Sequence, residues 1–96
     1  MPATIVIPTQ HAEIRMQQRR ISQTDIEAVV TYGREFHHAD AVIYVIGRRE
    51  VRAYSKVADL TQLQGLHAIV GPRGELITTY RNSAFSPKKF SRRRGH

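Results

Sequence analysis

The chain has 96 residues, no cysteine and a formal net charge of +7 at pH 7. This length suits one small domain with a single two-layer core. Without cysteine, a disulfide framework and a thiolate zinc cluster are excluded, so we expect an intracellular, cytoplasmic protein. No stretch approaches the ~20 apolar residues that span a bilayer, and we expect neither a secretion signal nor a membrane partner.

The excess of positive charge is concentrated at the C-terminus. Residues 83–96 contain no acidic side chain, whereas residues 1–82 carry ten basic and eight acidic side chains. The five cations of the terminal segment are Lys88, Lys89, Arg92, Arg93 and Arg94. We therefore predict one domain over residues 1–82, followed by a mobile basic tail over 83–96 that binds RNA without reading its sequence.

The first element in chain order is an extended segment over residues 3–8, which ends at Pro8. Thr9 is a residue type that caps helices, because its hydroxyl accepts a hydrogen bond from a free backbone N–H. The sequence predicts a first helix from this cap to about Arg20.

A second helix follows directly. Ser22 and Asp25 have the spacing of a capping box, and Ile21 and Ile26 occupy the positions of a hydrophobic staple. Gly33 supplies the stop.

Strand patterns begin at residue 35. Residues 35–38 and 41–46 predict a hairpin with a tight connection at Ala39 and Asp40. The next segment, 48–57, fits either a third helix or a continued strand. Residues 58–65 fit a connection that contains a helical turn.

A second hairpin closes the domain. Residues 66–70 and 75–81 are rich in β-formers, and residues 71–74, Gly-Pro-Arg-Gly, favour a turn between them. Two helices followed by about four hairpin-linked strands predict an α+β fold, with the helices on one face of a roughly four-stranded antiparallel sheet.

The first helix carries an unusual set of cations. At about 100° per residue, His11, Arg15 and Arg19 fall on one narrow arc beside the apolar Ala12 and Met16. We call these three residues the His–Arg stripe and expect it to be half-buried. Unpaired charge out of water is costly, so either protein carboxylates or an external anion must balance it.

Carboxylates are scarce, which favours an external anion such as phosphate. The glutamates expected to face solvent instead are Glu13, Glu27, Glu50 and Glu75. In the structural alternative, Arg15 or Arg19 bridges the helix to strand carbonyls. His11 lies in the first turn, where the helix end disfavours imidazolium and attracts phosphate. It is therefore a candidate general base, or simply a histidine packed at a helix start.

The last strand offers further polar groups. Strict alternation predicts that Leu76, Thr78 and Tyr80 share one face, with their neighbours Ile77, Thr79 and Arg81 on the other. The Thr78 and Tyr80 hydroxyls could bind a phosphate or orient a base, and the Arg81 guanidinium could clamp an anion. Threonine is also an ordinary strand former.

The remaining histidines are weaker candidates. His37 and His38 adjoin a turn and are expected on opposite faces of an edge strand, while His67 is expected on the same side as Ile69. None of their spacings matches a metal-ligand motif, and no carboxylate cluster suggests a two-metal nuclease. We therefore expect no metal or other cofactor.

Two stretches carry a family resemblance. HAEIRMQQRRISQTDIEAVV (residues 11–30) and GELITTYRN (residues 74–82) resemble the bacterial family called domain of unknown function 4258. The shared features are the spacing of His, Ala, Arg-Met and Arg, the Ile-Ser helix start and a closing strand of the type viTvyR. The resemblance covers most of residues 11–82 and is loose between Phe36 and Leu66. Thr79 departs from it, because the family usually has an apolar residue there.

The resemblance implies a fold similar to the barnase, colicin and RelE-type ribonucleases, which include many toxins. On matching positions it implies a site formed by His11, Arg15, Arg19, Thr78 and Arg81, with Tyr80 as a lesser member.

The sequence hypothesis is thus a metal-independent endoribonuclease, toxin or toxin-like. In it, His11 transfers a proton at the ribose 2′-hydroxyl, and Arg15, Arg19 and Arg81 stabilise the phosphate. Thr78 and Tyr80 would position these groups. The alternatives are a non-catalytic RNA- or ribosome-binding module and a domain that binds an acidic protein such as an antitoxin.

Overall fold

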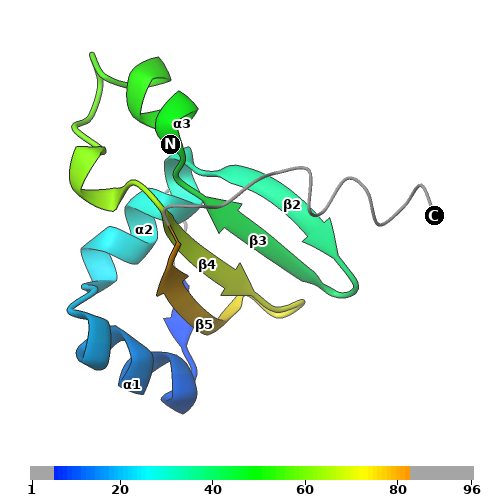
Figure 1. Cartoon of the computed structure of the whole chain (residues 1–96). Helices are drawn as coiled ribbons and strands as arrows, with labels where there is room; N and C mark the ends of the chain where they lie inside the picture. The colour runs from blue at the N-terminus through cyan, green and yellow to red at the C-terminus, as the bar shows by residue number, and fades with distance from the viewer. Residues whose placement is uncertain (1–5, 83–96) are drawn as a thin grey trace.

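A computed structural model describes residues 6–82 of the chain (Figure 1). The elements in chain order are β1 (Ile7–Pro8), α1 (Gln10–Arg19), α2 (Gln23–Tyr32), β2 (Arg34–His38), β3 (Ala41–Val45), α3 (Arg48–Ala53), the 3-10 helix η1 (Thr61–Leu63), β4 (Leu66–Val70) and β5 (Glu75–Arg81). Among the helices of this described part, none combines the length and apolarity needed to cross a bilayer.

The mixed α+β class is confirmed, but the sheet has five strands in the order β1-β5-β4-β3-β2 rather than four. The extra strand is β1, which runs parallel to β5 with Ile7 opposite Glu75 and Pro8 opposite Leu76. The other neighbours are antiparallel. The extended segment that ends at Pro8 therefore pairs with the open edge of β5 before the chain turns into α1.

Helix α1 begins and ends as local signals require. The Thr9 hydroxyl accepts a hydrogen bond from the Ala12 N–H at 3.2 Å, which confirms the predicted cap. At the other end, Arg20 adopts a left-handed conformation with φ of 57°. Its N–H reaches the Gln17 carbonyl, and the Ile21 N–H reaches the Met16 carbonyl, so the helix closes in a Schellman arrangement.

Helix α2 has the predicted capping box: Ser22 and Asp25 exchange side-chain to backbone hydrogen bonds of 3.0 Å each. Gly33 ends the helix, but with an extended backbone at φ −70° rather than a left-handed one. A Cβ there would lie 2.4 Å from the Val29 carbonyl oxygen and 3.0 Å from the Val45 nitrogen. Glycine is therefore required for close approach of two backbones.

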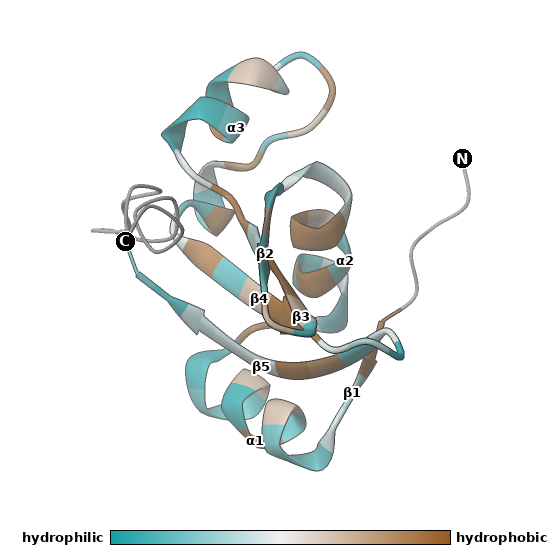
Figure 2. Ribbon diagram, turned by 90° about the vertical axis from the view of Figure 1, so that its right-hand side faces the viewer, coloured by the Kyte–Doolittle hydropathy of each residue, from teal (hydrophilic) through white to brown (hydrophobic). Residues whose placement is uncertain are grey.

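The hydrophobic core lies between one face of the sheet and the two N-terminal helices. Leu66, Ala68 and Val70 project from β4 into a cluster that includes Met16 of α1 and Ile26 of α2. In Figures 1 and 2, α2 covers β3 and β4, while α1 lies along β5 and β1. We call this side of the sheet the helix face and the other side the opposite face.

A β-bulge changes the facing of β5. Val70 pairs with Leu76 whereas Ile69 pairs with Thr78, so Ile77 is the extra residue. Leu76 and Thr79 are consequently both buried on the helix face. The strict alternation predicted from sequence was wrong for Leu76, because the bulge shifts the pattern by one residue.

Both predicted hairpins are confirmed, with Ala39 at φ 55° in the first turn. Residues 48–57, for which the sequence allowed either a helix or a strand, contain the helix α3. The helical turn predicted after this segment is η1. His37 and His38 lie exposed on the edge strand β2.

Candidate nucleic-acid interface

The His–Arg stripe lies on the surface of α1. Arg15 is half-buried, but His11 and Arg19 are exposed. The expectation of a half-buried stripe was therefore wrong for two of its three members. The burial of α1 is concentrated on Ala12 and Met16, which leaves the adjacent arc open to solvent.

Within residues 6–82, none of the three stripe side chains makes a hydrogen bond or an ion pair. The structural alternative, in which Arg15 or Arg19 binds strand carbonyls, is therefore wrong. The stripe presents two guanidinium groups and an imidazole to solvent, an arrangement suited to an anionic ligand.

Helix α1 is anchored to β5 next to the stripe. The Thr9 N–H donates to the Leu76 carbonyl at 2.9 Å, and the Thr9 hydroxyl donates to the Ile77 carbonyl at 3.3 Å. His11 follows Thr9 by two residues and Thr78 follows Ile77 directly. This anchor fixes the start of the stripe beside β5, but the Thr78 side chain lies on the opposite face of the sheet from α1, so the predicted convergence of Thr78 with the stripe is not seen.

Thr78 and Tyr80 lie together on the opposite face, where they are paired with Ile69 and His67 of β4. The Tyr80 ring stacks on the imidazole of His67, with 4.6 Å between centroids. Burial raises the pKa of Tyr80, so its phenol stays protonated and can donate a hydrogen bond. His67 itself is buried on the same side as Ile69, as predicted.

Arg81 is directed elsewhere. Its register partner is Leu66, which faces the helix side of the sheet. Its guanidinium donates to the carbonyl oxygens of Gln62 at 2.9 Å and Gln64 at 3.4 Å. Arg81 therefore ties β5 to the η1 loop, across the sheet from Thr78 and Tyr80.

The remaining predicted binding residues belong to the tail. Lys88, Lys89, Arg92, Arg93 and Arg94 lie outside the described residues.

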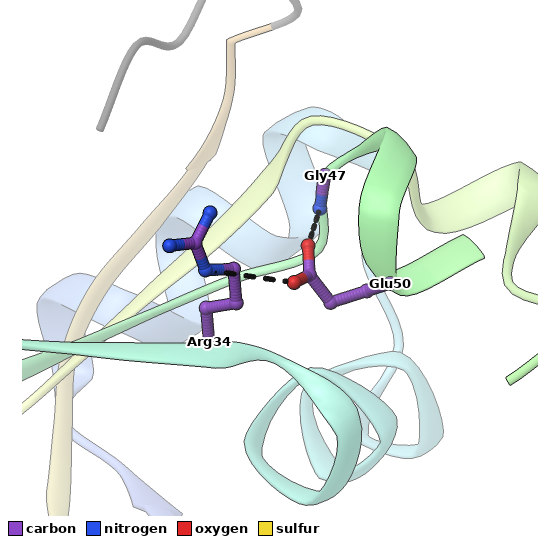
Figure 3. A network of polar contacts seen from close by, with 3 residues as sticks. All are labelled: Arg34, Gly47 and Glu50. Atoms are coloured by element: carbon purple, nitrogen blue, oxygen red, sulfur yellow. Dashed lines mark hydrogen bonds and ion pairs between the residues drawn. The ribbon is translucent and has the colours of Figure 1, made fainter. Parts of the chain in front are cut away.

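Two features were missed by the sequence reasoning. Glu50, expected to face solvent, is only 7 % exposed. Its carboxylate accepts the Gly47 N–H at 2.8 Å and lies 3.7 Å from Nε of Arg34 (Figure 3). The second feature is a set of exposed cations on and after α3: Arg48, Arg49, Arg52 and Lys56. The basic sequence RREVR was the available signal for it.

Two grooves in the described part of the surface are lined by residues other than the stripe. One, of about 510 Å³, lies between the end of α1 and the start of α2 and is lined by Pro8, Glu13, Met16, Gln17, Arg20, Ile21, Ser22 and Gln23. The other, of about 320 Å³, is lined by Val45, Ile46, Gly47, Arg48, Arg49, Gln64, Gly65 and Asn82. Within residues 6–82, no group of three or more His, Asp or Glu side chains is placed to hold a metal ion.

Comparison with known proteins gives one result at the level of family. Residues 9–85 match the family described as Domain of unknown function (DUF4258). Searches of curated proteins and of solved structures returned no match. The matched segment begins at the Thr9 cap of α1 and continues past the end of β5. Because the match spans most of its length, the chain belongs to the DUF4258 family.

Proposed function

We propose that this protein is a metal-independent endoribonuclease that binds the RNA backbone at the His–Arg stripe. The observation that carries the proposal is the set of exposed His11 and Arg19 and half-buried Arg15 beside β5, whose side chains make no hydrogen bond or ion pair within residues 6–82. Guanidinium groups bind phosphate through forked donors, and an imidazole next to a bound phosphate can transfer protons near neutral pH.

The proposed reaction is an internal transesterification. His11 removes the proton of the ribose 2′-hydroxyl, and the 2′-oxygen forms a bond to phosphorus. The bond from phosphorus to the 5′-oxygen breaks, and that oxygen takes a proton from water. Arg15 and Arg19 stabilise the added negative charge of the transition state. The products are a 2′,3′-cyclic phosphate and a free 5′-hydroxyl.

Residues of β5 have supporting parts in this proposal. Thr78 and the protonated phenol of Tyr80 lie on the opposite face of the sheet from α1, so in this proposal they bind phosphates of the same RNA away from the stripe. Arg81 has the smaller part, because its guanidinium already binds the Gln62 and Gln64 carbonyls. The basic tail adds affinity that does not depend on RNA sequence.

The fold suits this assignment. Helices that cover one face of a largely antiparallel sheet are the arrangement expected of a barnase- or RelE-like ribonuclease. We therefore propose that the protein is a cytoplasmic toxin or toxin-like effector, for which an acidic antitoxin is the natural protein partner. The analogy to toxins depends on this arrangement of helices and sheet, whereas the proposed RNA cleavage depends on the stripe.

The second candidate is an RNA- or ribosome-binding module without catalysis. The hydrogen bonds from Arg81 to backbone carbonyls favour this candidate, because one of the three arginines expected to bind phosphate already has other partners. The exposed His11 and Arg19 would then hold phosphates only. Binding of an acidic protein partner is the third candidate.

A cleavage assay separates these candidates. Labelled RNA is incubated in EDTA with the wild type, His11→Ala, Arg15→Ala and the control Gln17→Ala, which alters an exposed residue on another side of α1. We expect cleavage by the wild type and the control, with the His11 variant slower by about 10²–10⁴-fold. Salt-sensitive binding without cleavage by the wild type identifies the binding module instead. If RNA binding is also absent, the acidic partner is the remaining candidate.

A further inference from the structure

Helix α3 and the turn after it present a concentrated positive charge. Arg48, Arg49, Arg52 and Lys56 are all exposed. We call these four residues the α3 patch. Within residues 6–82, none of their side chains forms an ion pair or a side-chain hydrogen bond. In Figures 1 and 2, α3 and α1 lie at opposite ends of the molecule, so this patch is separate from the His–Arg stripe.

The one carboxylate within α3 does not neutralise the patch. Glu50 points inward, where it accepts the Gly47 N–H and approaches Arg34 of β2 (Figure 3). Its burial has two effects: it fixes a six-residue helix to the end of the sheet, and it leaves cations as the only exposed charged side chains of α3. The patch is therefore a charged surface on an anchored element.

The spacing and chemistry of the patch suit a phosphodiester chain. Arg48 and Arg52 are one helical turn apart, about 6 Å along the axis, which is of the order of the separation between successive phosphates in an extended strand. Three of the four cations are arginines, whose planar forks bind phosphate in two-point contacts and stack on bases.

A groove lies next to the patch. Arg48 and Arg49 line it together with Gln64 and Asn82. Its volume of about 320 Å³ gives room for part of a nucleotide beside the two guanidinium groups.

We propose that the α3 patch is a second RNA-binding surface, which holds single-stranded RNA by its phosphates at the end of the domain away from the stripe. The inference rests on the proposed function in taking RNA as the ligand. RNA fits better than an acidic protein, because the patch combines arginines with an adjacent groove that has room for part of a nucleotide. Protein interfaces usually have a buried apolar or aromatic centre, and the four side chains of the α3 patch are all cationic.

The test compares two pairs of substitutions that change the net charge equally. The patch pair is Arg48→Gln with Arg52→Gln. The control pair is Arg20→Gln with Arg73→Gln, two exposed arginines outside α3. Dissociation constants of the full-length proteins for fluorescein-labelled single-stranded RNA are measured over a series of salt concentrations. Poly-L-glutamate serves as the second polyanion, and thermal melts verify that every variant is folded.

We expect the patch pair to lose about tenfold in RNA affinity at about 0.15 M salt and to lower the salt slope by about 1.4, while the control pair loses less than about twofold. Equal losses for the two pairs, or no loss for the patch pair, overturn the proposal. An equal loss for RNA and poly-L-glutamate also overturns it, in favour of an acidic protein ligand.

The outcome is independent of catalysis. If RNA is bound but not cut, and the patch pair alone weakens binding, the proposed nuclease activity fails while the α3 patch stands. If RNA is cut and the two pairs behave alike, the patch fails while the nuclease proposal stands.

Discussion

The imidazole of His67 stacks on the phenol ring of Tyr80 across neighbouring strands, with 4.6 Å between ring centroids and 20° between ring planes. His67 is 1 % exposed, and its Nδ1–H donates to the Gly65 carbonyl at 2.9 Å. Burial lowers the pKa of His67, and the hydrogen bond to Gly65 opposes this only in part. The opposite face of the sheet thus contains a histidine whose protonation is disfavoured in the folded state and becomes easier when the chain unfolds.

The stability of the fold should therefore depend on this histidine. Because the pKa of His67 is lower in the folded state than its unfolded value of about 6.5, the unfolded chain binds the proton more tightly. The free energy of unfolding should be greatest above about pH 6.5 and decrease as the pH falls below it. Urea titrations at several pH values measure this slope, which His67→Phe should flatten and the exposed-site control His38→Gln should preserve. Equal slopes in all three proteins would contradict the assignment.

The contact between Arg34 and Glu50 should contribute measurably to stability. A half-exposed guanidinium and a buried carboxylate 3.7 Å apart lie between a surface pair and a buried one, so we expect a coupling of about 1 kcal/mol. Arg34→Met keeps the length of the side chain, and Glu50→Gln keeps an acceptor for the Gly47 N–H. A double-mutant cycle of these substitutions, measured by urea unfolding, isolates the coupling. A value near zero would mean that Glu50 is held by Gly47 alone.

The left-handed residue that ends α1 provides a stabilising substitution. Arg20 has φ of 57°, where a side chain is unfavourable and glycine is not. Arg20→Gly should raise the free energy of unfolding by about 0.5–1 kcal/mol. The same change at Gln18, an exposed position inside the helix, should lower it by about 1 kcal/mol. Destabilisation by both substitutions in thermal melts would show that the Arg20 side chain itself stabilises this end.

Local signals explain how much of the fold the sequence could predict. The Thr9 cap, the Ser22–Asp25 box and the two hairpin turns each depend on residues within four positions, and each is present. The pairing of β1 with β5 joins Pro8 to Leu76, far apart in the chain, and a two-residue strand has no periodicity to reveal it. The bulge at Ile77 similarly depends on how β4 meets β5.

The candidate site divides in the same way. Helical periodicity placed His11, Arg15 and Arg19 on one arc, because that relation is internal to α1. The burial of Glu50 depends on Arg34, a partner on another element, and no spacing along the sequence encodes it. The engagement of Arg81 by the Gln62 and Gln64 carbonyls depends on the path of the η1 loop, which the sequence leaves undetermined.

Gly33 was correctly predicted to end α2, but the structure gives a different reason for glycine at this position. Its backbone is extended, so the constraint is the space beside Val29 and Val45. Gly33→Ala should destabilise the fold by about 2–3 kcal/mol, because rigid backbone atoms must move. At Gly71 the nearest atoms belong to the Glu75 side chain, which can rotate, so Gly71→Ala should cost less. Equal losses in urea unfolding would show that the backbone near Gly33 yields as easily as a side chain.

The salt dependence of RNA binding should report the His–Arg stripe directly. Each phosphate contact on a single strand contributes about 0.7 to the slope of log affinity against log salt. If Arg15 and Arg19 each bind one phosphate, Arg15→Gln with Arg19→Gln should reduce the slope by about 1.4 for every RNA sequence. His11→Gln should leave the slope nearly unchanged and slow cleavage by about 10²–10⁴-fold. An unchanged slope in the double variant would place the bound phosphates elsewhere and remove the stripe from the binding site.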